Sequence, residues 1–555
     1  MCDRRLWFVL ALVLVITGAF GWRLFELQIV EGGEWRAQAK GQQKVFTQAQ
    51  GDRGEVYLHS NGEPITAATN KKVYHAYISP RRLANRDKEE LASEISEALN
   101  AERENILERM ERDSSYEVIK KDLSGEKLEK IGKMEEVHIQ EEITRYYPEE
   151  ELASHVLGFL GGENKGQYGV EQYYEEILSG EVGIREGLRN PWGSLITRDS
   201  VQRGEDIFLT LDYNIQHFAE RKLAERIEKF DADGGMALVG DPQTGEIVAM
   251  VDYPGFDPND YSDYNSGVFS NSLIQSAFEP GSVFKPLTMA AALNEDVVTP
   301  GDTFYDTGKV QIHGRTIYNY GRRSYNEVDM SKILENSINT GIVHVKDQLG
   351  NDRFLDYLYD LGFFESTGID LHGEVSPPNR GFLMGHDINY ATASYGQGIE
   401  ATAIQLFKAF SSLANDGEMV QPHVTQREGE VPGGEKVFSE ESAHLTTEMM
   451  VNTVEDGFGA TAKVPGYHIA GKTGTAQVPW SALGINRSGY SDRTKQGFIG
   501  FAPAFDPEFL IFVNLDNPRS RSAEVSAAPL FKEIAEFMFE YEKIPPDYDK
   551  NETSE

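Results

Sequence analysis

One uncharged apolar segment near the N-terminus, residues 6–22, sets the cellular environment in which the rest of the chain must fold. As an α-helix it spans about 25 Å, close to the ~30 Å hydrocarbon core of a bilayer. Arg4 and Arg5 precede it, so the positive-inside rule predicts a cytoplasmic tail at residues 1–5 and an exported remainder. Small residues at 17–19 also allow a cleaved signal peptide in place of a retained transmembrane anchor at 6–22. In both cases the bulk of the chain is expected outside the membrane.

The charge balance and the cysteine count exclude several classes of function. The chain carries 53 Lys and Arg against 89 Asp and Glu, a formal net charge of −36 at pH 7. A net negative charge of this size repels phosphate backbones, so nucleic acid is not expected as a partner. A single cysteine excludes a disulfide framework and a cysteine-based zinc site within one chain. None of the 12 histidines pair at the spacing of a HExxH site, and we predict no metal and no cofactor.

The exported part of the sequence contains two regions with different residue patterns. Between residues 86 and 142 charge dominates, and Leu91, Ile95 and Leu99 recur at helical spacing, which predicts small amphipathic helices. Beyond residue 234, strand patterns joined by turns alternate with apolar helices, which predicts an α+β domain on an antiparallel sheet. The expected segments are a stalk at 23–50, an accessory domain at 51–233, a second domain at 234–543 and a disordered acidic tail at 544–555.

The strongest chemical signal is a serine and a lysine three residues apart, Ser282 and Lys285, after a Pro-Gly turn and before an apolar stretch that predicts a buried helix. At this spacing both side chains lie on one helical face, so the amine can reach the hydroxyl. Burial or a neighbouring cation must lower the lysine pKa from about 10.4 before it can act as a base. A second copy at Ser124 and Lys127 lies in an acidic, solvated helix without such a turn, and we interpret it as chance.

A second pattern, Ser337 and Asn339, follows an apolar helical stretch. A second hydroxyl can relay a proton between a lysine and a leaving amine, and an asparagine amide can hold a substrate amide. A similar Ser-x-Asn at Ser324 lies in a polar loop, so the pattern is weak by itself.

A third pattern places a lysine, two threonines and a glycine on a predicted strand: Lys472, Thr473, Gly474 and Thr475. A lysine with two hydroxyls suits a carboxylate, and a glycine lets a substrate backbone approach closely. The amide of Thr475 could complete an oxyanion hole with that of Ser282. A surface Lys-Thr-Gly turn is the alternative reading of this pattern.

The three patterns occur in the order Ser-x-x-Lys, Ser-x-Asn and Lys-Thr-Gly, the set tied to penicillin-binding proteins and β-lactamases. With them, the sequence resembles the class B penicillin-binding proteins over nearly its whole length. Outside the candidate site the resemblance includes Asp52–Gly54, Arg145–Pro148, Gly169–Glu171, Leu209–Asp212, Thr367–Leu371 and Tyr395–Ile399. It implies an α+β, β-lactamase-like transpeptidase domain with helices on both faces of its antiparallel sheet. It also implies an elongated α+β pedestal domain before that domain and one N-terminal transmembrane helix.

The resemblance implies a serine-type peptidoglycan D,D-transpeptidase that crosslinks stem peptides during cell wall synthesis. Ser282 would be the acylated nucleophile, Lys285 its general base and Ser337 the proton relay. The substrate-binding residues would be Asn339, Lys472, Thr473, Gly474 and Thr475. The nucleophile would attack the bond between two terminal D-alanines, and an amine of a neighbouring stem peptide would resolve the acyl-enzyme. β-Lactams would acylate the same serine.

The resemblance also implies a location and partners. The protein would be a single-pass protein of the inner (cytoplasmic) membrane with its catalytic domain outside. No glycosyltransferase domain is expected between anchor and catalytic domain, so glycan polymerisation would come from a multi-pass membrane polymerase. Proteins of the divisome or elongasome would be further partners.

Other functions remain open at this point. In a D,D-carboxypeptidase or a β-lactamase, water replaces the acceptor amine. A β-lactam sensor would need more membrane helices or a cytoplasmic effector, whereas only residues 1–5 precede the apolar segment. A scaffold that activates the polymerase without catalysis is a further reading. Sequence alone also leaves open whether the chain serves division, elongation or sporulation.

Overall fold

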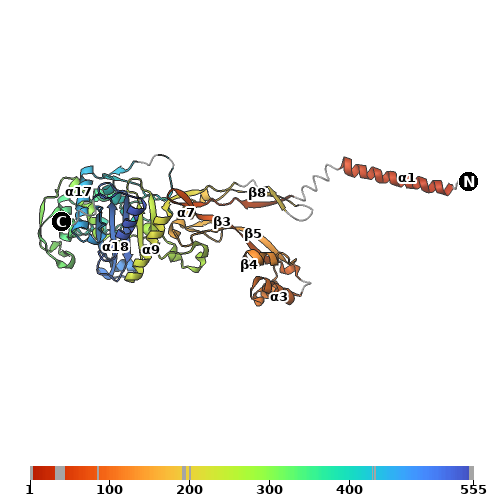
Figure 1. The fold of residues 1–555 in the computed structure, drawn as a ribbon, viewed down its shortest axis with the longest axis horizontal. Helices are drawn as coiled ribbons and strands as arrows, with labels where there is room; N and C mark the ends of the chain where they lie inside the picture. Colours follow the sequence, from red (N-terminus) through yellow and green to blue (C-terminus); the bar gives the residue numbers. More distant parts are fainter. Residues whose placement is uncertain are drawn as a thin grey trace. The chain divides into compact units, whose positions relative to one another are not determined.

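The computed structural model describes residues 4–31, 44–83, 87–189, 195–198, 202–427, 429 and 433–548. The chain divides into two compact units, shown with the rest of the fold in Figure 1. The first comprises residues 1–54 and 176–205, and the second comprises residues 55–175 and 206–555. The second unit carries every residue predicted for the site.

The apolar N-terminal segment of the first unit is one long helix. Helix α1 (Arg4–Phe25) contains the run at 6–22, and a π-helical turn, η1 (Glu26–Val30), continues it. The stretch Trp7–Val30 is long and apolar enough to cross a membrane, and none of it is buried against protein. An apolar helix with no protein packed on it is suited to lipid. Strands of the same unit form an antiparallel sheet in the order β1 (Lys44–Gln50), β8 (Val182–Arg189) and β9 (Leu195–Arg198).

The second unit begins with a five-stranded sheet. Asn61 and Gly62 both adopt left-handed φ angles, 49° and 82°, and form a two-residue hairpin turn, the geometry that an Asn-Gly pair favours. The sheet order is β10-β2-β3-β4, with β5 also paired to β3, and only the β10–β2 pair among them is parallel. The strands are β2 (Val56–Ser60), β3 (Glu63–Ile78), β4 (Glu117–Leu123), β5 (Val137–Tyr146) and β10 (Ile207–Asp212).

Small helices cover part of this sheet, as the helical spacing between residues 86 and 142 predicts. Leu91, Ile95 and Leu99 of α3 (Lys88–Leu99) are buried in one apolar cluster with Ile106 of α4 (Arg103–Glu111). The further short elements are α5 (Gly125–Ile131), α6 (Ser154–Leu157), β6 (Phe159–Leu160), β7 (Gly166–Gln167), α7 (Gly169–Tyr173) and α8 (Glu175–Leu178). A buried ion pair of 2.6 Å between Arg145 Nε and Glu171 Oε1 joins β5 to α7.

The C-terminal part of the second unit is built on one antiparallel sheet in the order β12-β11-β21-β20-β19. Its strands are β11 (Gly234–Gly240), β12 (Ile247–Tyr253), β19 (Ala470–Pro479), β20 (Tyr490–Ala502) and β21 (Phe509–Asp516). Strand β19 lies at the edge. The α+β prediction for the region beyond residue 234 is confirmed.

Helices pack on both faces of this sheet. On one face, α9 (Tyr213–Phe230) and α18 (Ala527–Tyr541) lie side by side and share an apolar core with β21 (Figure 1). On the other face, a Cβ atom at Gly240 would lie 2.7 Å from Phe407 of α16 (Ala403–Ala414). Helix α9 falls in the range predicted for the accessory domain, 51–233, yet its apolar face packs on this sheet, because Leu223 and Ile227 contact β11 at Gly235.

The remaining elements connect these layers. They are η2 (Pro80–Arg82), η3 (Pro258–Asp263), η4 (Ser266–Phe269), α10 (Ser272–Gln275), η5 (Gly281–Phe284), α11 (Lys285–Asn294), β13 (Thr303–Asp306), β14 (Lys309–Ile312), β15 (Arg315–Tyr318), η6 (Tyr320–Arg322), β16 (Asn326–Asp329), α12 (Met330–Glu335), α13 (Asn339–Leu349), α14 (Asn351–Asp360), η7 (Phe382–Met384), α15 (Asp387–Ala393), β17 (Glu418–Met419), β18 (Glu435–Lys436), α17 (Glu440–Glu455), η8 (Ala460–Ala462) and η9 (Trp480–Leu483).

The start of the predicted tail, 544–555, folds against the domain. The Tyr467 hydroxyl donates to the Ile544 carbonyl at 2.7 Å, and Asp547 accepts from the His468 amide at 2.7 Å. Residues 549–555 lie outside the described residues.

Candidate active site

The predicted nucleophile lies on a tight helical turn. Ser282 belongs to η5, a 3-10 turn, and Lys285 is the first residue of α11. The buried helix predicted after the Pro-Gly turn is therefore present, and a tighter 3-10 turn precedes it. Gly281 has a φ of 62°, which explains the Pro-Gly pair before the serine. In a 3-10 turn, side chains at i and i+3 eclipse one another. The turn therefore directs Ser282 and Lys285 to the same side.

Lys285 is fully buried, and its amine contacts the second motif. Its Nζ lies 2.6 Å from the Ser337 carbonyl oxygen, 3.0 Å from Ser337 Oγ and 2.8 Å from Asn339 Oδ1. Burial, with a smaller contribution from the nearby Lys472, holds the pKa of Lys285 well below its usual value. The lysine is thus poised to carry a neutral amine in the pH range where a free lysine is charged.

The second motif is held by a buried polar network. Ser337 sits between α12 and α13 with a left-handed φ of 52°, and Asn339 begins α13. The next residue, Thr340, donates from its amide to Asn319 Oδ1 at 3.0 Å and from its hydroxyl to Asp306 Oδ1 at 2.6 Å. All three of these residues are buried. The network fixes the start of α13, and with it the amide of Asn339 and the hydroxyl of Ser337.

The third motif lies on the edge strand β19. Lys472 is fully buried, and its Nζ lies 3.1 Å from Ser337 Oγ and 3.0 Å from the Thr473 carbonyl oxygen. Burial lowers the pKa of Lys472 to about 7. Side chains alternate along a strand, so Thr473 and Thr475 project to the opposite side from Lys472 and Gly474. On that side, the Thr475 hydroxyl accepts a hydrogen bond of 3.1 Å from the Ala523 amide.

The structure therefore brings four predicted residues into direct contact. Ser337 Oγ lies between the amines of Lys285 and Lys472, and Asn339 completes the group. Ser282 joins them through the turn that it shares with Lys285. The Thr473 and Thr475 side chains do not join this group.

Two glycines let other segments touch the turn that carries Ser282. A Cβ atom at Gly474 would lie 2.8 Å from Val283 Cγ1 and 3.0 Å from the Pro280 carbonyl oxygen. The sequence predicts close approach of substrate at this glycine, and in the structure the neighbour is η5 itself. From another side, Gly281 donates its amide to the Gly396 carbonyl at 2.9 Å. Gly396 belongs to the resemblance, but sequence reasoning assigned it no role at the site.

We expect Gly396→Ala to destabilise the fold and disturb the site. Gly396 has a φ of 74°, and a Cβ atom there would lie 2.3 Å from the Gly281 carbonyl oxygen and 2.6 Å from its nitrogen. Strain and overlap with rigid backbone together predict a loss of about 3 kcal/mol in the free energy of unfolding. Urea denaturation measures it. Gly267→Ala is the matched control, because a Cβ atom there meets nothing within 4 Å. Equal stability of the two variants would contradict the inference that Gly396 packs tightly against the backbone of Gly281.

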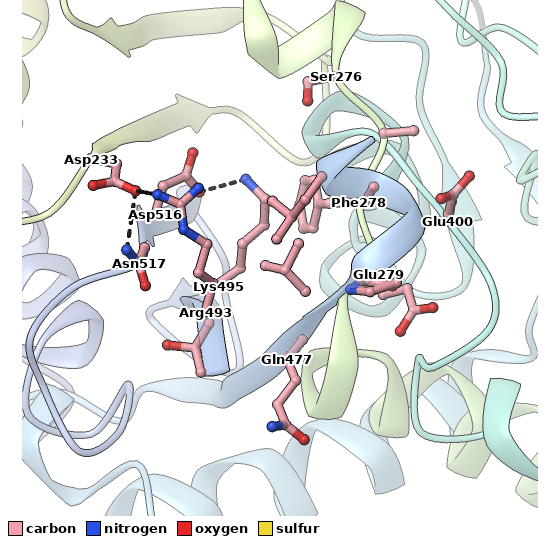
Figure 2. Close-up of a pocket in the computed structure, with 17 residues that line it drawn as sticks. Asp233, Ser276, Phe278, Glu279, Glu400, Gln477, Arg493, Lys495, Asp516 and Asn517 are labelled. Carbon is pink, nitrogen blue, oxygen red and sulfur yellow. Dashed lines mark hydrogen bonds and ion pairs between the residues drawn. The ribbon is translucent and has the colours of Figure 1, made fainter. Parts of the chain in front are cut away.

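A cavity of about 270 Å³ adjoins the motifs (Figure 2). It is lined by Glu279, three residues before Ser282, and by Ala476 and Gln477, which follow Thr475 on β19. Glu279 accepts a hydrogen bond of 3.0 Å from the Tyr490 hydroxyl, and burial raises its pKa to about 7. Sequence reasoning gave this glutamate no role, although it stands at the head of the Ser-x-x-Lys segment.

One group of side chains has a geometry compatible with a metal ion. Among the described residues, ligand atoms of Asp416, Glu440 and His444 lie within 4.8 Å of one another, and all three residues are exposed. His444 Nε2 already pairs with Asp416 Oδ1 at 2.8 Å. The group shares no residue with the three motifs.

Comparisons with known proteins agree with this architecture. Residues 235–536 match the model of the penicillin-binding protein transpeptidase domain, and residues 48–209 match that of the penicillin-binding protein dimerisation domain. Stage V sporulation protein D of Bacillus subtilis is 32% identical over 544 residues, which cover 93% of this chain and 82% of that protein. The probable peptidoglycan D,D-transpeptidase PbpC of Pseudomonas aeruginosa is 31% identical over 504 residues, covering 88% of this chain and 86% of that protein.

A solved structure shares the fold. Penicillin-binding protein 2X of Streptococcus thermophilus superposes with a TM-score of 0.73 at 21% identity, covering 90% of this chain and 81% of that chain. The two matched domain models cover most of the sequence, and relatives above 30% identity match over most of their own length. The chain belongs to the class B penicillin-binding proteins, a family of peptidoglycan D,D-transpeptidases.

Proposed function

We propose that this protein crosslinks peptidoglycan through an acyl-serine intermediate on Ser282. The observation that carries the proposal is the buried amine of Lys285, which contacts Ser337 and Asn339 and has a pKa well below its usual value. A neutral lysine amine one helical turn from a serine is the arrangement that a serine nucleophile with a lysine base requires.

In the first half-reaction, neutral Lys285 takes the proton of the Ser282 hydroxyl while Oγ attacks the carbonyl between the two terminal D-alanines. The new C–O bond replaces the C–N bond, and D-alanine leaves with a proton delivered from Lys285 through the Ser337 hydroxyl. A neutral amine has a lone pair besides its N–H donors, so the hydroxyl 3.0 Å away can exchange a proton with it. The amides of Ser282 and Thr475 would stabilise the oxyanion.

In the second half-reaction, the amine of a neighbouring stem peptide attacks the ester. The C–N bond of the crosslink replaces the ester bond, and the proton released by the amine returns to Ser282 Oγ by the same relay. Water in place of the amine would give the D,D-carboxypeptidase reaction as a side activity. β-Lactams would form an ester with Ser282 that does not turn over.

The other site residues would hold the donor peptide. Lys472 and Thr473 would bind its terminal carboxylate, and Asn339 would bind an amide of its backbone. Gly474 and Thr475 would lie beside the extended peptide at the sheet edge, where a strand offers unpaired backbone groups.

The location and partners follow from the anchor and the reaction. We propose that α1 is retained as a single span in the inner (cytoplasmic) membrane, with the catalytic domain outside. The domains would be the anchor at 6–22, a pedestal at 51–233 and the transpeptidase at 234–543. A multi-pass membrane glycan polymerase, with divisome or elongasome proteins, would supply the glycan strands.

The direct test is to locate the acyl group. The full-length protein in detergent is incubated with benzylpenicillin, digested with protease and analysed by mass spectrometry. We expect one penicilloyl adduct per chain, on the peptide that contains Ser282. An adduct on another residue, or none on folded protein, would refute the acyl-serine proposal.

The pH dependence of acylation should reflect the protonation states of both Lys285 and Lys472. Lys285 accepts a proton only when neutral, so the rate falls as the pH drops through its lowered pKa. Lys472 attracts a carboxylate only as a cation, so the rate also falls above its pKa of about 7. The second-order rate constant with a fluorescent penicillin is therefore expected to be bell-shaped. In Lys472→Arg the guanidinium stays charged, and the alkaline limb should vanish. Its persistence in that variant would argue against the assignment to Lys472.

A further inference from the structure

The cavity beside the motifs begins on β19, directly beyond the residues proposed to bind the D-alanine pair. Ala476 and Gln477 follow Thr475 directly and line it. A Cβ atom at Gly281 would lie 3.0 Å from the Ala476 Cβ, so the cavity begins where β19 meets the nucleophile turn. A donor peptide extended along the free edge of β19 would therefore have the residue beyond Thr475 level with this cavity.

The cavity has an apolar wall. Phe278, a residue that is 7% exposed, contributes an aromatic ring, and Val478, Pro479 and Leu483 contribute aliphatic surface. Such a wall suits a chain of methylene groups more than a short polar side chain.

The cations of the cavity are already neutralised. Arg493 pairs with Asp233 at 2.7 Å, and Lys495 pairs with Asp516 (Figure 2). Asn517 adds a hydrogen bond of 3.1 Å to Asp233. These groups satisfy one another and leave no cation to receive an anionic ligand.

Two carboxylates on the other side of Phe278, Glu279 and Glu400, have no such partner (Figure 2). Within the described part of the chain, neither forms an ion pair with a cation. Among the described residues, the carboxylate of Glu279 accepts hydrogen bonds from two neutral groups, the Tyr490 hydroxyl and the Gly398 amide. Burial and, to a smaller extent, the nearby charge of Glu400 raise its pKa. The cavity therefore has unmatched negative charge at the end of an apolar wall.

We propose that this cavity binds the ammonium-bearing side chain of the diamino acid in the donor stem peptide, and the inference rests on the proposed function. Crosslinking joins a carbonyl of one stem peptide to an amine of another, so every stem peptide carries an amine-bearing residue. The donor's own amine is not consumed and must be accommodated. The methylenes lie on the wall of Phe278 and Val478, and the ammonium lies between the carboxylates of Glu279 and Glu400. A cation there also offsets the desolvation of the partly buried Glu279.

The test uses two penicillins as probes, because their acyl side chain occupies the place of the donor peptide. One side chain ends in a primary ammonium after several methylenes, and the other is the same compound with its amine acetylated. Stopped-flow measurement on the full-length protein gives the second-order acylation rate constant of each. For the wild type we expect the ammonium compound to react about tenfold faster, the scale of one charge-assisted hydrogen bond.

The double variant Glu279→Gln/Glu400→Gln should bring this ratio close to one. Glu400→Gln alone should lower it partway, and it poses little risk to folding because the Glu400 side chain is partly exposed. The matched control is Glu508→Gln/Glu540→Gln, which removes the same charge from exposed positions outside the cavity and should keep the wild-type ratio.

Two results would overturn the inference. The first is a wild-type ratio near one, and the second is a ratio that survives in the double variant. Failure of both penicillins to acylate the wild type would instead refute the acyl-serine reaction, and the inference would fall with it.

Discussion

Replacing Ser282 with alanine is expected to abolish covalent penicillin binding completely. The substitution removes only the hydroxyl group, and the oxygen of that group is the atom proposed to form the ester. Because Ser282 is only partly buried and the structure assigns its hydroxyl no hydrogen bond within the described residues, the variant should keep its fold. Intact mass spectrometry of the full-length protein after incubation with benzylpenicillin checks this, with the unfolding midpoint measured in parallel.

The chain offers its own control for this experiment. Ser124 heads the second Ser-x-x-Lys sequence, which the structure places at the exposed start of α5. Ser124→Ala should be acylated like the wild type. If Ser282→Ala still forms the adduct, or if Ser124→Ala loses it, the assignment of the nucleophile is wrong.

Replacing Lys285 with methionine is expected to slow acylation between about a hundredfold and ten-thousandfold, the range for loss of a general base. Methionine fills a similar volume in a fully buried position, but it leaves the Ser337 and Asn339 oxygens without the amine. Part of any loss could therefore come from displaced groups. The second-order rate constant with a fluorescent penicillin is the measurement, and the unfolding midpoint is compared with that of the wild type.

Lys285→Arg separates the loss of the general base from the displacement of the groups that contact the lysine. The guanidinium can donate to the same oxygens but stays protonated at every accessible pH, so it cannot accept the serine proton. We expect this variant to fold and to remain as slow as Lys285→Met. Lys127→Met, at the second Ser-x-x-Lys sequence, is the control for lysine removal. Near wild-type acylation in a folded Lys285→Arg protein would exclude lysine as the base.

Local patterns predicted the amphipathic helices between residues 86 and 142 and the α+β character of the region beyond residue 234. Leu91, Ile95 and Leu99 appear on one buried face of α3, because an amphipathic helix repeats its apolar residues at helical spacing. The three motifs were found from residue type and spacing alone. Their convergence depends on β19 lying beside η5, a contact between residues nearly 200 positions apart, and it could be anticipated only through resemblance to a family.

Other features of the site left no local signal. Gly396 is one glycine among 53, and only the fold reveals that its backbone touches Gly281. Glu279 reads as an ordinary surface acid until Tyr490 and Gly398 are seen to enclose it. The η5 turn is 3-10 in form and touches both β19 and the loop at Gly396, and local propensity reports neither contact. Tertiary contacts of this kind decide the geometry of the site.

The close contacts around the η5 turn also have a consequence for antibiotic resistance. The η5 turn contacts β19 at Gly474 and the loop at Gly396, and both contacts are too close to admit a side chain. A substitution that moved this turn to weaken drug binding would also disturb the fold and the reaction with the natural substrate. The lining of the neighbouring cavity is less restricted, because under our proposal it would contact the part of a ligand that differs between a drug and a stem peptide. Resistance in this protein should therefore arise first from changes around that cavity, with the turn itself unchanged.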